Sequence, residues 1–391
     1  MTWELGAGYG HLAPLLALAR PLQEQGHTLA FAARDVAAAE AVLGGSGMPY
    51  FQAPANFTPQ GRGSLHSYPQ ILLNTAFNDL TELKGRVRAW RALYTLFEPD
   101  ILVCDHSPSA LLAACGLPMH CIATGNGFVL PPDVSPLPEL RPWEPADPAT
   151  LAADETKALT MANTVLVELK APPLARIAEL SNSAHQALFT LQELDNYADE
   201  RRGAEYWGMP PGPTGAPPPW PEGDGKRIFL YGQPFGGLSQ VLTDLVAAGH
   251  RALVYVPKLT PEQRRELAHP RLHLSDALLD MDAVSRDCDC AAMTNGHGTT
   301  AAMLLAGKPV LLLPQHLEML HIAGSVEKAG AGLSALALKP EGIRNKLMRL
   351  LQEPGFSERA RAIAARYRGK ADPASAQRHF QALIARLTEA S

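Results

Sequence analysis

The order of apolar and polar positions along the chain predicts alternating strands and helices. Apolar runs long enough for a strand buried on both faces are followed by segments in which Leu and Ala recur at helical spacing. In the first half, strands are expected at residues 2–5, 27–33 and 99–105, and helices at residues 12–25, 35–44 and 109–115. Such alternation is typical of a parallel, doubly wound sheet.

A segment rich in Pro and Gly, residues 207–225, interrupts this pattern and suits neither a helix nor an interior strand. Beyond it the alternation resumes, with strands at residues 226–231, 251–256, 290–294 and 309–315, helices at 239–248 and 299–305, and about fifty helical residues at the end. The chain of 391 residues is also too long for one ordinary core. We therefore expect an α/β fold with two doubly wound Rossmann-like domains, residues 1–206 and 226–391, joined by the linker 207–225.

Two stretches, residues 57–90 and 131–148, are less regular and rich in Pro, Asn and Ser. Irregular excursions after the strands of such a sheet form the rim where ligands bind. They are the candidates for an acceptor-binding region.

Composition narrows the class of protein. Hydrophobic residues make up 46% and charged residues 19%, which fits a globular protein, and a net charge of -5 offers no basic field for nucleic acid. The start of the chain lacks the features of a signal peptide, and no apolar run is long enough to span a bilayer. We expect a cytoplasmic protein without a nucleic-acid partner. The sequence leaves the oligomeric state open.

Cysteines and histidines give no sign of a metal site. The five cysteines are scattered, so disulfides are not expected in a chain of this size, and Cys288 and Cys290 lack the CxxC spacing. The separations of His297, His316 and His321 match no compact site either. The prediction is that the protein binds no metal.

A glycine-rich turn, Gly6-Ala-Gly-Tyr-Gly-His11, follows the first expected strand and opens a helix. Its backbone N–H groups suit an anionic or polar ligand. The GxGxxG pattern of dinucleotide-binding proteins would need a third glycine where His11 stands. Asp35 has a plain role as a helix cap. A dehydrogenase is therefore disfavoured.

His11 is the candidate catalytic base, because an imidazole at the end of a strand can accept a proton from a hydroxyl near neutral pH. Asp105 ends another expected strand of the same sheet, so its carboxylate could orient the ring. The alternative is that both residues merely cap the helices that follow them. His106 is a second candidate for the base.

A second turn, residues 294–300, again joins a buried strand to a helix and contains glycines and hydroxyls. Backbone N–H groups near Gly298, with the hydroxyls of Thr299 and Thr300, would bind a diphosphate at the helix N-terminus. The alternative is an ordinary tight turn capped by Thr299.

Together the two turns resemble the UDP-glycosyltransferase and MurG-like group of GT-B enzymes. GYGHLAPLLALARPLQEQGHTLAFAA is similar to the opening GHxxPxLxLAxxLxxxGHxVxF of that group, and TNGHGTTAAMLLAGKPVLLLPQHLEMLHIAGSVEKAGAG resembles its donor-site segment. The two motifs occur in the right order on either side of the Pro-rich segment.

The resemblance implies two domains facing across a cleft and an inverting, metal-independent transfer of a sugar to a small, hydrophobic acceptor. It makes His11 the base and Asp105 its partner, and the nucleotide-sugar is a substrate, so no cofactor is expected. The donor-binding residues that it implies are Thr294, Asn295, Gly296, His297, Gly298, Thr299, Thr300 and Glu318.

The donor segment departs from the pattern of the group at three positions. Thr294 stands in place of a His, Ala302 in place of an acidic residue, and Met319 in place of a Gln after Glu318. Met319 cannot donate the amide hydrogen bond of that Gln. Two alternatives therefore stay open: a degenerate homologue that binds a ligand or a partner protein, and a nucleotide-sugar epimerase.

Overall fold

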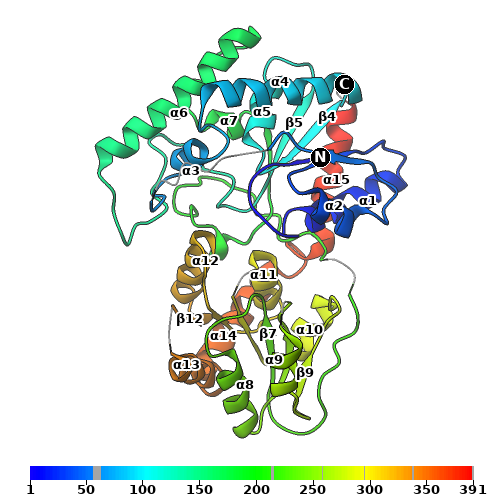
Figure 1. Cartoon of the computed structure of the whole chain (residues 1–391), viewed down its shortest axis with the longest axis vertical. Helices are drawn as coiled ribbons and strands as arrows, with labels where there is room; N and C mark the ends of the chain where they lie inside the picture. The colour runs from blue at the N-terminus through cyan, green and yellow to red at the C-terminus, as the bar shows by residue number, and fades with distance from the viewer. Residues whose placement is uncertain (56–62, 213–214, 258, 295, 337–338, 390–391) are drawn as a thin grey trace. The chain divides into compact units, whose positions relative to one another are not determined.

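Two parallel sheets organise the chain. A computed structural model describes residues 1–55, 63–212, 215–257, 259–294, 296–336 and 339–389 (Figure 1). These residues form two compact units: the first contains residues 1–189, 197–207 and 377–391, and the second contains residues 190–196 and 208–376. Each unit has a six-stranded parallel sheet with its first strand near the centre. The two doubly wound sheets predicted from the sequence are confirmed.

The sheet of the first unit has the strand order β3-β2-β1-β4-β5-β6. Its strands are β1 (Thr2–Trp3), β2 (Phe31–Ala33), β3 (Tyr50–Gln52), β4 (Ile101–Asp105), β5 (His120–Gly125) and β6 (His185–Leu188). Trp3 of β1 pairs with Ala33 on one side and with Asp105 on the other. Because these strands are parallel, the turn after β1 and the end of β4 lie at the same edge of the sheet.

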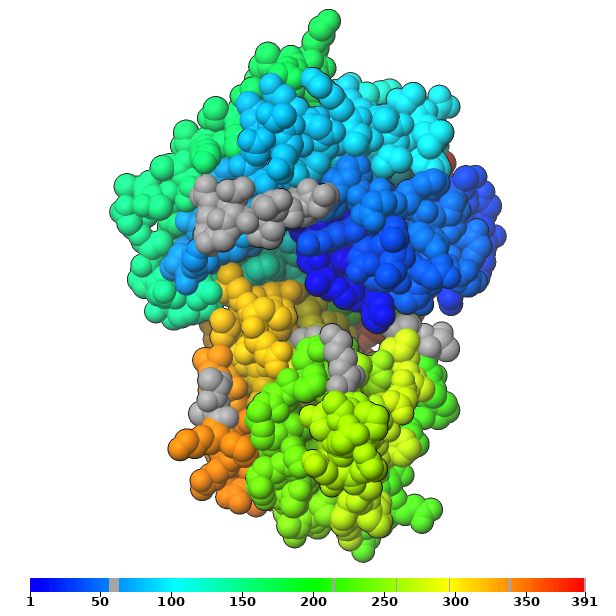
Figure 2. All heavy atoms as spheres, viewed as in Figure 1, coloured from blue at the N-terminus to red at the C-terminus, as the bar shows by residue number. Residues whose placement is uncertain are grey.

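Helices connect these strands and cover the sheet. They are α1 (Leu12–Glu24), α2 (Val36–Leu43), α3 (Tyr68–Asn74), α4 (Leu80–Phe97), α5 (Pro108–Ala114), α6 (Pro148–Leu169) and α7 (Glu179–Asn182). The long helix α6 lies at the surface of the first unit (Figure 2). Val167 near the end of this helix is exposed.

The expectation that residues 57–90 are irregular is wrong for most of this range. Residues 56–62 lie outside the described part of the chain, but α3 and more than half of α4 follow. The buried side chains of Leu83, Val87 and Trp90 recur at helical spacing, and Asp79 caps the helix by accepting a hydrogen bond from the N–H of Glu82. Residues 131–147 contain no helix or strand, as expected.

The sheet of the second unit has the order β12-β11-β10-β7-β8-β9. Its strands are β7 (Arg227–Tyr231), β8 (Arg251–Tyr255), β9 (Leu272–Leu274), β10 (Cys290–Met293), β11 (Val310–Leu312) and β12 (Gly332–Ser334). The helical segments are η1 (Gln192–Leu194), α8 (Leu238–Ala247), α9 (Pro261–Glu266), α10 (Met281–Asp287), α11 (His297–Leu305), α12 (Leu317–Lys328), α13 (Pro340–Gln352) and α14 (Pro354–Tyr367).

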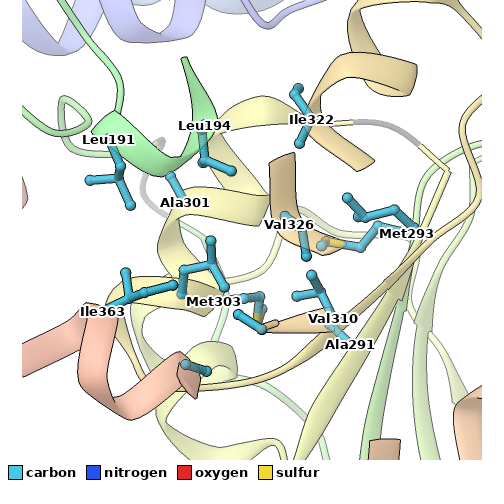
Figure 3. Close-up of a cluster of buried hydrophobic side chains, with 14 of the residues drawn as sticks. Leu191, Leu194, Ala291, Met293, Ala301, Met303, Val310, Ile322, Val326 and Ile363 are labelled. Atoms are coloured by element: carbon cyan, nitrogen blue, oxygen red, sulfur yellow. The ribbon is translucent and has the colours of Figure 1, made fainter. Parts of the chain in front are cut away.

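Apolar side chains fill the space between the second sheet and its helices. Figure 3 shows one such cluster, in which Ala291 and Met293 of β10 and Val310 of β11 lie among side chains of α11, α12 and α14. Met303 of α11 and Val326 of α12 are fully buried there. This packing fixes α11, and with it the turn that precedes the helix.

Two segments pack differently from what the sequence boundaries suggest. The segment 208–225 has no helix or strand in its described residues, but Ala216 exchanges backbone hydrogen bonds with the chain near Leu279 in the second unit. The last helix, α15 (Pro373–Glu389), places residues 377–391 with the first unit. There Phe380 is buried against Phe189, and the amide of Gln377 donates to the Ala17 carbonyl of α1.

None of the helices in the described residues is long and apolar enough to cross a membrane. All five cysteines are free thiols.

Candidate active site

The turn after β1 depends on glycine. Gly6 and Gly8 have φ values of 96° and 77°, a region that favours glycine. The turn carries the chain from the sheet into α1, which begins at Leu12. His11 immediately precedes the helix, and its side chain makes no capping hydrogen bond. The imidazole is therefore directed elsewhere.

The His11 ring contacts the Asp105 carboxylate. Nδ1 of His11 lies 3.1 Å from Oδ1 of Asp105, and their side chains are 20% and 9% exposed. A carboxylate only accepts hydrogen bonds, so Nδ1 carries the proton and donates it. Nε2 then holds the lone pair that can accept a proton. The structure thus brings together the two residues that the sequence singled out, although they lie 94 positions apart in the chain.

Three further groups fix this ring. Trp3 stacks on His11 with ring centroids 5.4 Å apart and an interplanar angle of 18°. Gly6 lies against the other end of the ring, where a Cβ atom would come within 2.2 Å of Nε2. A guanidinium nitrogen of Arg34 donates to the Gly6 carbonyl at 3.1 Å. No local sequence pattern indicates that Trp3 and Arg34 belong to this site.

Capping does not explain the position of Asp105. The N-terminus of α5 is served by Glu4, whose carboxylate accepts hydrogen bonds from the N–H groups of Ser109 at 2.8 Å and Ala110 at 3.3 Å. Since Glu4 takes these donors, the Asp105 side chain is available for His11.

His106 is poorly suited to the role of base. It is buried, and burial together with the positive charges of His11 and Arg34 lowers its pKa to about 3. An imidazole with such a pKa holds a proton weakly. His11, at the end of the turn after β1, is therefore a better base than His106, which follows β4.

The turn between β10 and α11 also depends on a glycine. Gly296 precedes α11 with a φ of 105°, and a Cβ there would lie 3.0 Å from the Tyr231 ring. A hydrogen bond joins the side chains of Tyr231 and Thr299, while burial raises the pKa of the tyrosine. At Gly298, the second residue of the helix, a Cβ would lie 3.4 Å from the methyl group of Met209. The N–H groups of the first helical turn suit an anion.

Two of the hydroxyls expected to contact a donor serve the protein instead. Thr294 is buried, and its Oγ1 accepts a hydrogen bond from the N–H of Gln233 at 2.6 Å. Thr300 is also buried and donates to the Gly296 carbonyl at 2.9 Å. Asn295, also expected at this site, lies outside the described residues. The Thr294 hydroxyl thus ties the start of the turn to the segment after β7, and the Thr300 hydroxyl bonds within the turn.

His297 and Glu318 lie near each other at the starts of α11 and α12. Nε2 of His297 lies 2.8 Å from the hydroxyl of Thr190, a partner 107 positions away that the sequence gave no means of finding. Burial lowers the pKa of His297, while Glu318 and Asp195 oppose the shift. Met319 is buried in the core. Over the part of the chain that the structure describes, no group of three or more His, Cys, Asp or Glu residues could hold a metal ion.

Comparison of the sequence with protein-family models and with curated proteins finds no match. Comparison of the structure does find similar proteins. The glycotransferase of kitacinnamycin has a TM-score of 0.71 at 18% identity, with 97% of this chain and 96% of that chain covered. The glycosyltransferase VinC, in complex with dTDP, has a TM-score of 0.69 at 17% identity, with 100% and 99% covered.

A third similar structure is the spinosyn rhamnosyltransferase SpnG complexed with spinosyn aglycone. Its TM-score is 0.66 at 18% identity, with 97% of this chain and 99% of that chain covered. The likeness extends over nearly the full length of all three proteins, so the chain has the GT-B fold of glycosyltransferases.

Proposed function

We propose that this protein is an inverting glycosyltransferase that moves a sugar from a nucleotide-sugar to a hydroxyl of a small, hydrophobic acceptor without a catalytic metal. The observation that carries the proposal is the His11–Asp105 contact of 3.1 Å in the first unit of a GT-B fold. Fold alone does not define a reaction. An imidazole oriented by a carboxylate is, however, the group that activation of a hydroxyl requires.

In the proposed reaction, Nε2 of His11 takes the proton of the acceptor hydroxyl as its oxygen attacks the anomeric carbon. A bond forms between that oxygen and the carbon, and the bond from the carbon to the diphosphate breaks. The electron pair leaves with the nucleoside diphosphate, and the configuration at the carbon inverts. Asp105 stabilises the imidazolium and keeps the proton of the neutral ring on Nδ1.

The second unit supplies the proposed donor site. The N–H groups at the start of α11 would bind the diphosphate, aided by the Thr299 hydroxyl and by the close approach that Gly296 and Gly298 permit. Glu318 would accept hydrogen bonds from hydroxyls of the sugar. Because VinC was solved with dTDP and SpnG with spinosyn aglycone, a dTDP-sugar and spinosyn aglycone are the first pair to test.

The test of the proposed base is the variant His11→Ala. Loss of a general base lowers turnover by about 10²- to 10⁴-fold, whereas nucleotide affinity should stay at the wild-type value. Transfer is measured by mass spectrometry of the product and nucleotide binding by calorimetry. His185→Ala, at the exposed start of β6, is the matched control. Wild-type turnover in His11→Ala would show that His11 is not the base.

A binding protein without transferase activity is the second candidate, favoured by the internal use of Thr294 and Thr300 and by the burial of Met319. Thermal shift with UDP, dTDP and GDP and their sugars separates the two. A nucleotide at 100 times its Kd adds about 2.7 kcal/mol of stability. Stabilisation by one nucleotide supports the transferase, and none at millimolar concentration supports the binding protein.

A further inference from the structure

His106, directly after Asp105, has an unusual backbone conformation and an unpaired nitrogen. Its φ of 43° lies in the left-handed region, which is costly for a residue other than glycine. The residue is 8% exposed, and its Nε2 is buried without a hydrogen-bond partner. A buried polar atom that lacks a partner costs stability. A hydrogen bond from Nε2 to a bound ligand would remove this cost.

His106 lines a narrow pocket of the first unit, wide enough for a group of about the size of a water molecule. Most of the other lining side chains are apolar, and the polar ones are few: the pocket is formed by Tyr68, Cys104, His106, Ser107, Pro108, Leu111, Ala123, Val129, Leu130, Ile177, Leu180 and Ser181. A pocket this narrow admits only the end of a ligand, and a polar group on its wall can fix that end through a hydrogen bond.

The hydroxyls of Ser107 and Ser181 near His106 donate their protons within the protein. The Ser107 hydroxyl donates to the Asp105 carbonyl at 3.0 Å, and the Ser181 hydroxyl donates to the Ala178 carbonyl at 3.4 Å. A buried water needs two to four polar partners. With these protons engaged, Ser107 and Ser181 offer such a water lone pairs but no donor.

We propose that His106 Nε2 hydrogen-bonds a carbonyl at the end of an otherwise apolar acceptor and thereby selects and orients that acceptor. This inference rests on the function proposed above. The rings of His106 and His11 lie with their centroids 6.4 Å apart. A group bound at His106 therefore places the adjoining part of the acceptor beside the base.

The neutral state of His106 supports this role. With a pKa of about 3, the ring stays uncharged across physiological pH. A neutral imidazole in the tautomer that carries its proton on Nε2 can donate a hydrogen bond to a carbonyl. A charged ring at the same place would repel the imidazolium that forms on His11.

The experiment compares two flat phenols of similar size, 7-hydroxycoumarin, which carries a ring carbonyl, and 2-naphthol, which has none. Binding is measured by fluorescence titration and transfer by product formation. The variants are His106→Phe, which keeps an aromatic ring, and His106→Gln, which restores a hydrogen-bonding group. Both replacements must adopt the same left-handed backbone conformation. His185→Phe is the control for replacing a histidine outside the pocket.

Wild type should bind 7-hydroxycoumarin roughly ten-fold more tightly than 2-naphthol, the value of one net hydrogen bond. His106→Phe should lose this preference, His106→Gln should recover part of it, and the KM for the nucleotide-sugar should not change. If the role of His106 were merely structural, its variants would instead lower kcat equally with both phenols, or would weaken binding of the nucleotide-sugar whichever phenol is present.

The outcomes also separate this inference from the proposed function. Carbonyl-dependent binding that is lost in His106→Phe, without any transfer, supports the pocket and contradicts the transferase. Equal affinity of wild type for both phenols, or no binding of either at millimolar concentration, would overturn the role of His106. A crystal structure in which a water on Nε2 persists in the complex would do the same.

Discussion

Gly6 sets the position of the His11 ring, because the ring occupies the space where any other residue would have its Cβ. We predict that Gly6→Ala lowers transfer by on the order of 10²-fold or more, since small displacements of a catalytic group are that costly. The positive φ of 96° adds strain. Turnover of the purified variant checks this.

Gly10→Ala is the matched control for this turn. Gly10 has an ordinary φ, and a Cβ there would meet no atom within 4 Å. This variant should keep wild-type turnover. If Gly6→Ala and Gly10→Ala were equally active, the ring would not be held by the space at Gly6.

The pKa of His106 makes stability depend on pH. The unfolded chain protonates this histidine near pH 6.5 and the folded chain near pH 3, so the unfolded state binds the proton over that window. The contribution of neutral His106 to the free energy of unfolding is complete above pH 6.5. It is lost as the pH falls toward 3, by up to about 1.4 kcal/mol per pH unit. Urea unfolding of wild type and His106→Phe should show a shallower decline in the variant. Parallel curves would contradict the lowered pKa.

At the scale of elements, Glu4 links β1 to α5 and α4. Its carboxylate accepts from the N–H groups of Ser109 and Ala110 at the start of α5 and from Nε1 of Trp90 at 2.8 Å. Burial raises the pKa of Glu4, while these donors oppose the shift. A single buried side chain therefore satisfies a helix N-terminus and an indole.

We predict that Glu4→Ala destabilises the first unit by about 3 kcal/mol, because several buried donors lose their acceptor together. Hydrogen exchange should accelerate most at the amides of Ser109 and Ala110. Glu24→Ala, at the exposed end of α1, should change stability by less than about 0.5 kcal/mol. Unchanged exchange in α5 would rule out this capping role.

The sequence could predict those elements whose signals are local. Apolar runs and glycine turns located β1, α1, β4 and β10, and helical spacing located α13 to α15. The helices α3 and α4 were missed because Pro, Asn and Ser near their ends concealed the spacing of Leu83, Val87 and Trp90. In contrast, the partners of Glu4 lie 86 and 105 positions away, and no local pattern encodes such contacts.

The same distinction applies to the candidate site. His11 and Asp105 each end a strand or a turn, so the convergence of parallel strands at one edge was enough to pair them. The roles of Trp3, Gly6 and His106 depend on ring stacking, a missing Cβ and a buried atom, which appear only in three dimensions. Thr294 and Thr300 show the converse: suitable residue types whose hydroxyls are used by the turn itself.

At the scale of the whole molecule, the first unit is built from both ends of the chain. Residues 377–391 follow the second unit in sequence but pack with the first. Four apolar side chains of α15 are almost fully buried there: Phe380, Leu383, Ile384 and Leu387. The ring centroids of His379 and Trp207 also lie 5.7 Å apart.

Deleting residues 377–391 should therefore unfold the first unit selectively. Burial of one large apolar side chain contributes roughly 1.5–3 kcal/mol, so four of them approach the 5–15 kcal/mol that stabilises a typical domain. Phe380→Ala alone should cost about 3–5 kcal/mol. Hydrogen exchange read separately for β1–β6 and β7–β12 should show loss of protection in the first sheet and wild-type protection in the second. Equal losses in both sheets would mean that the last helix stabilises the two units together, and unchanged protection would mean that it stabilises neither.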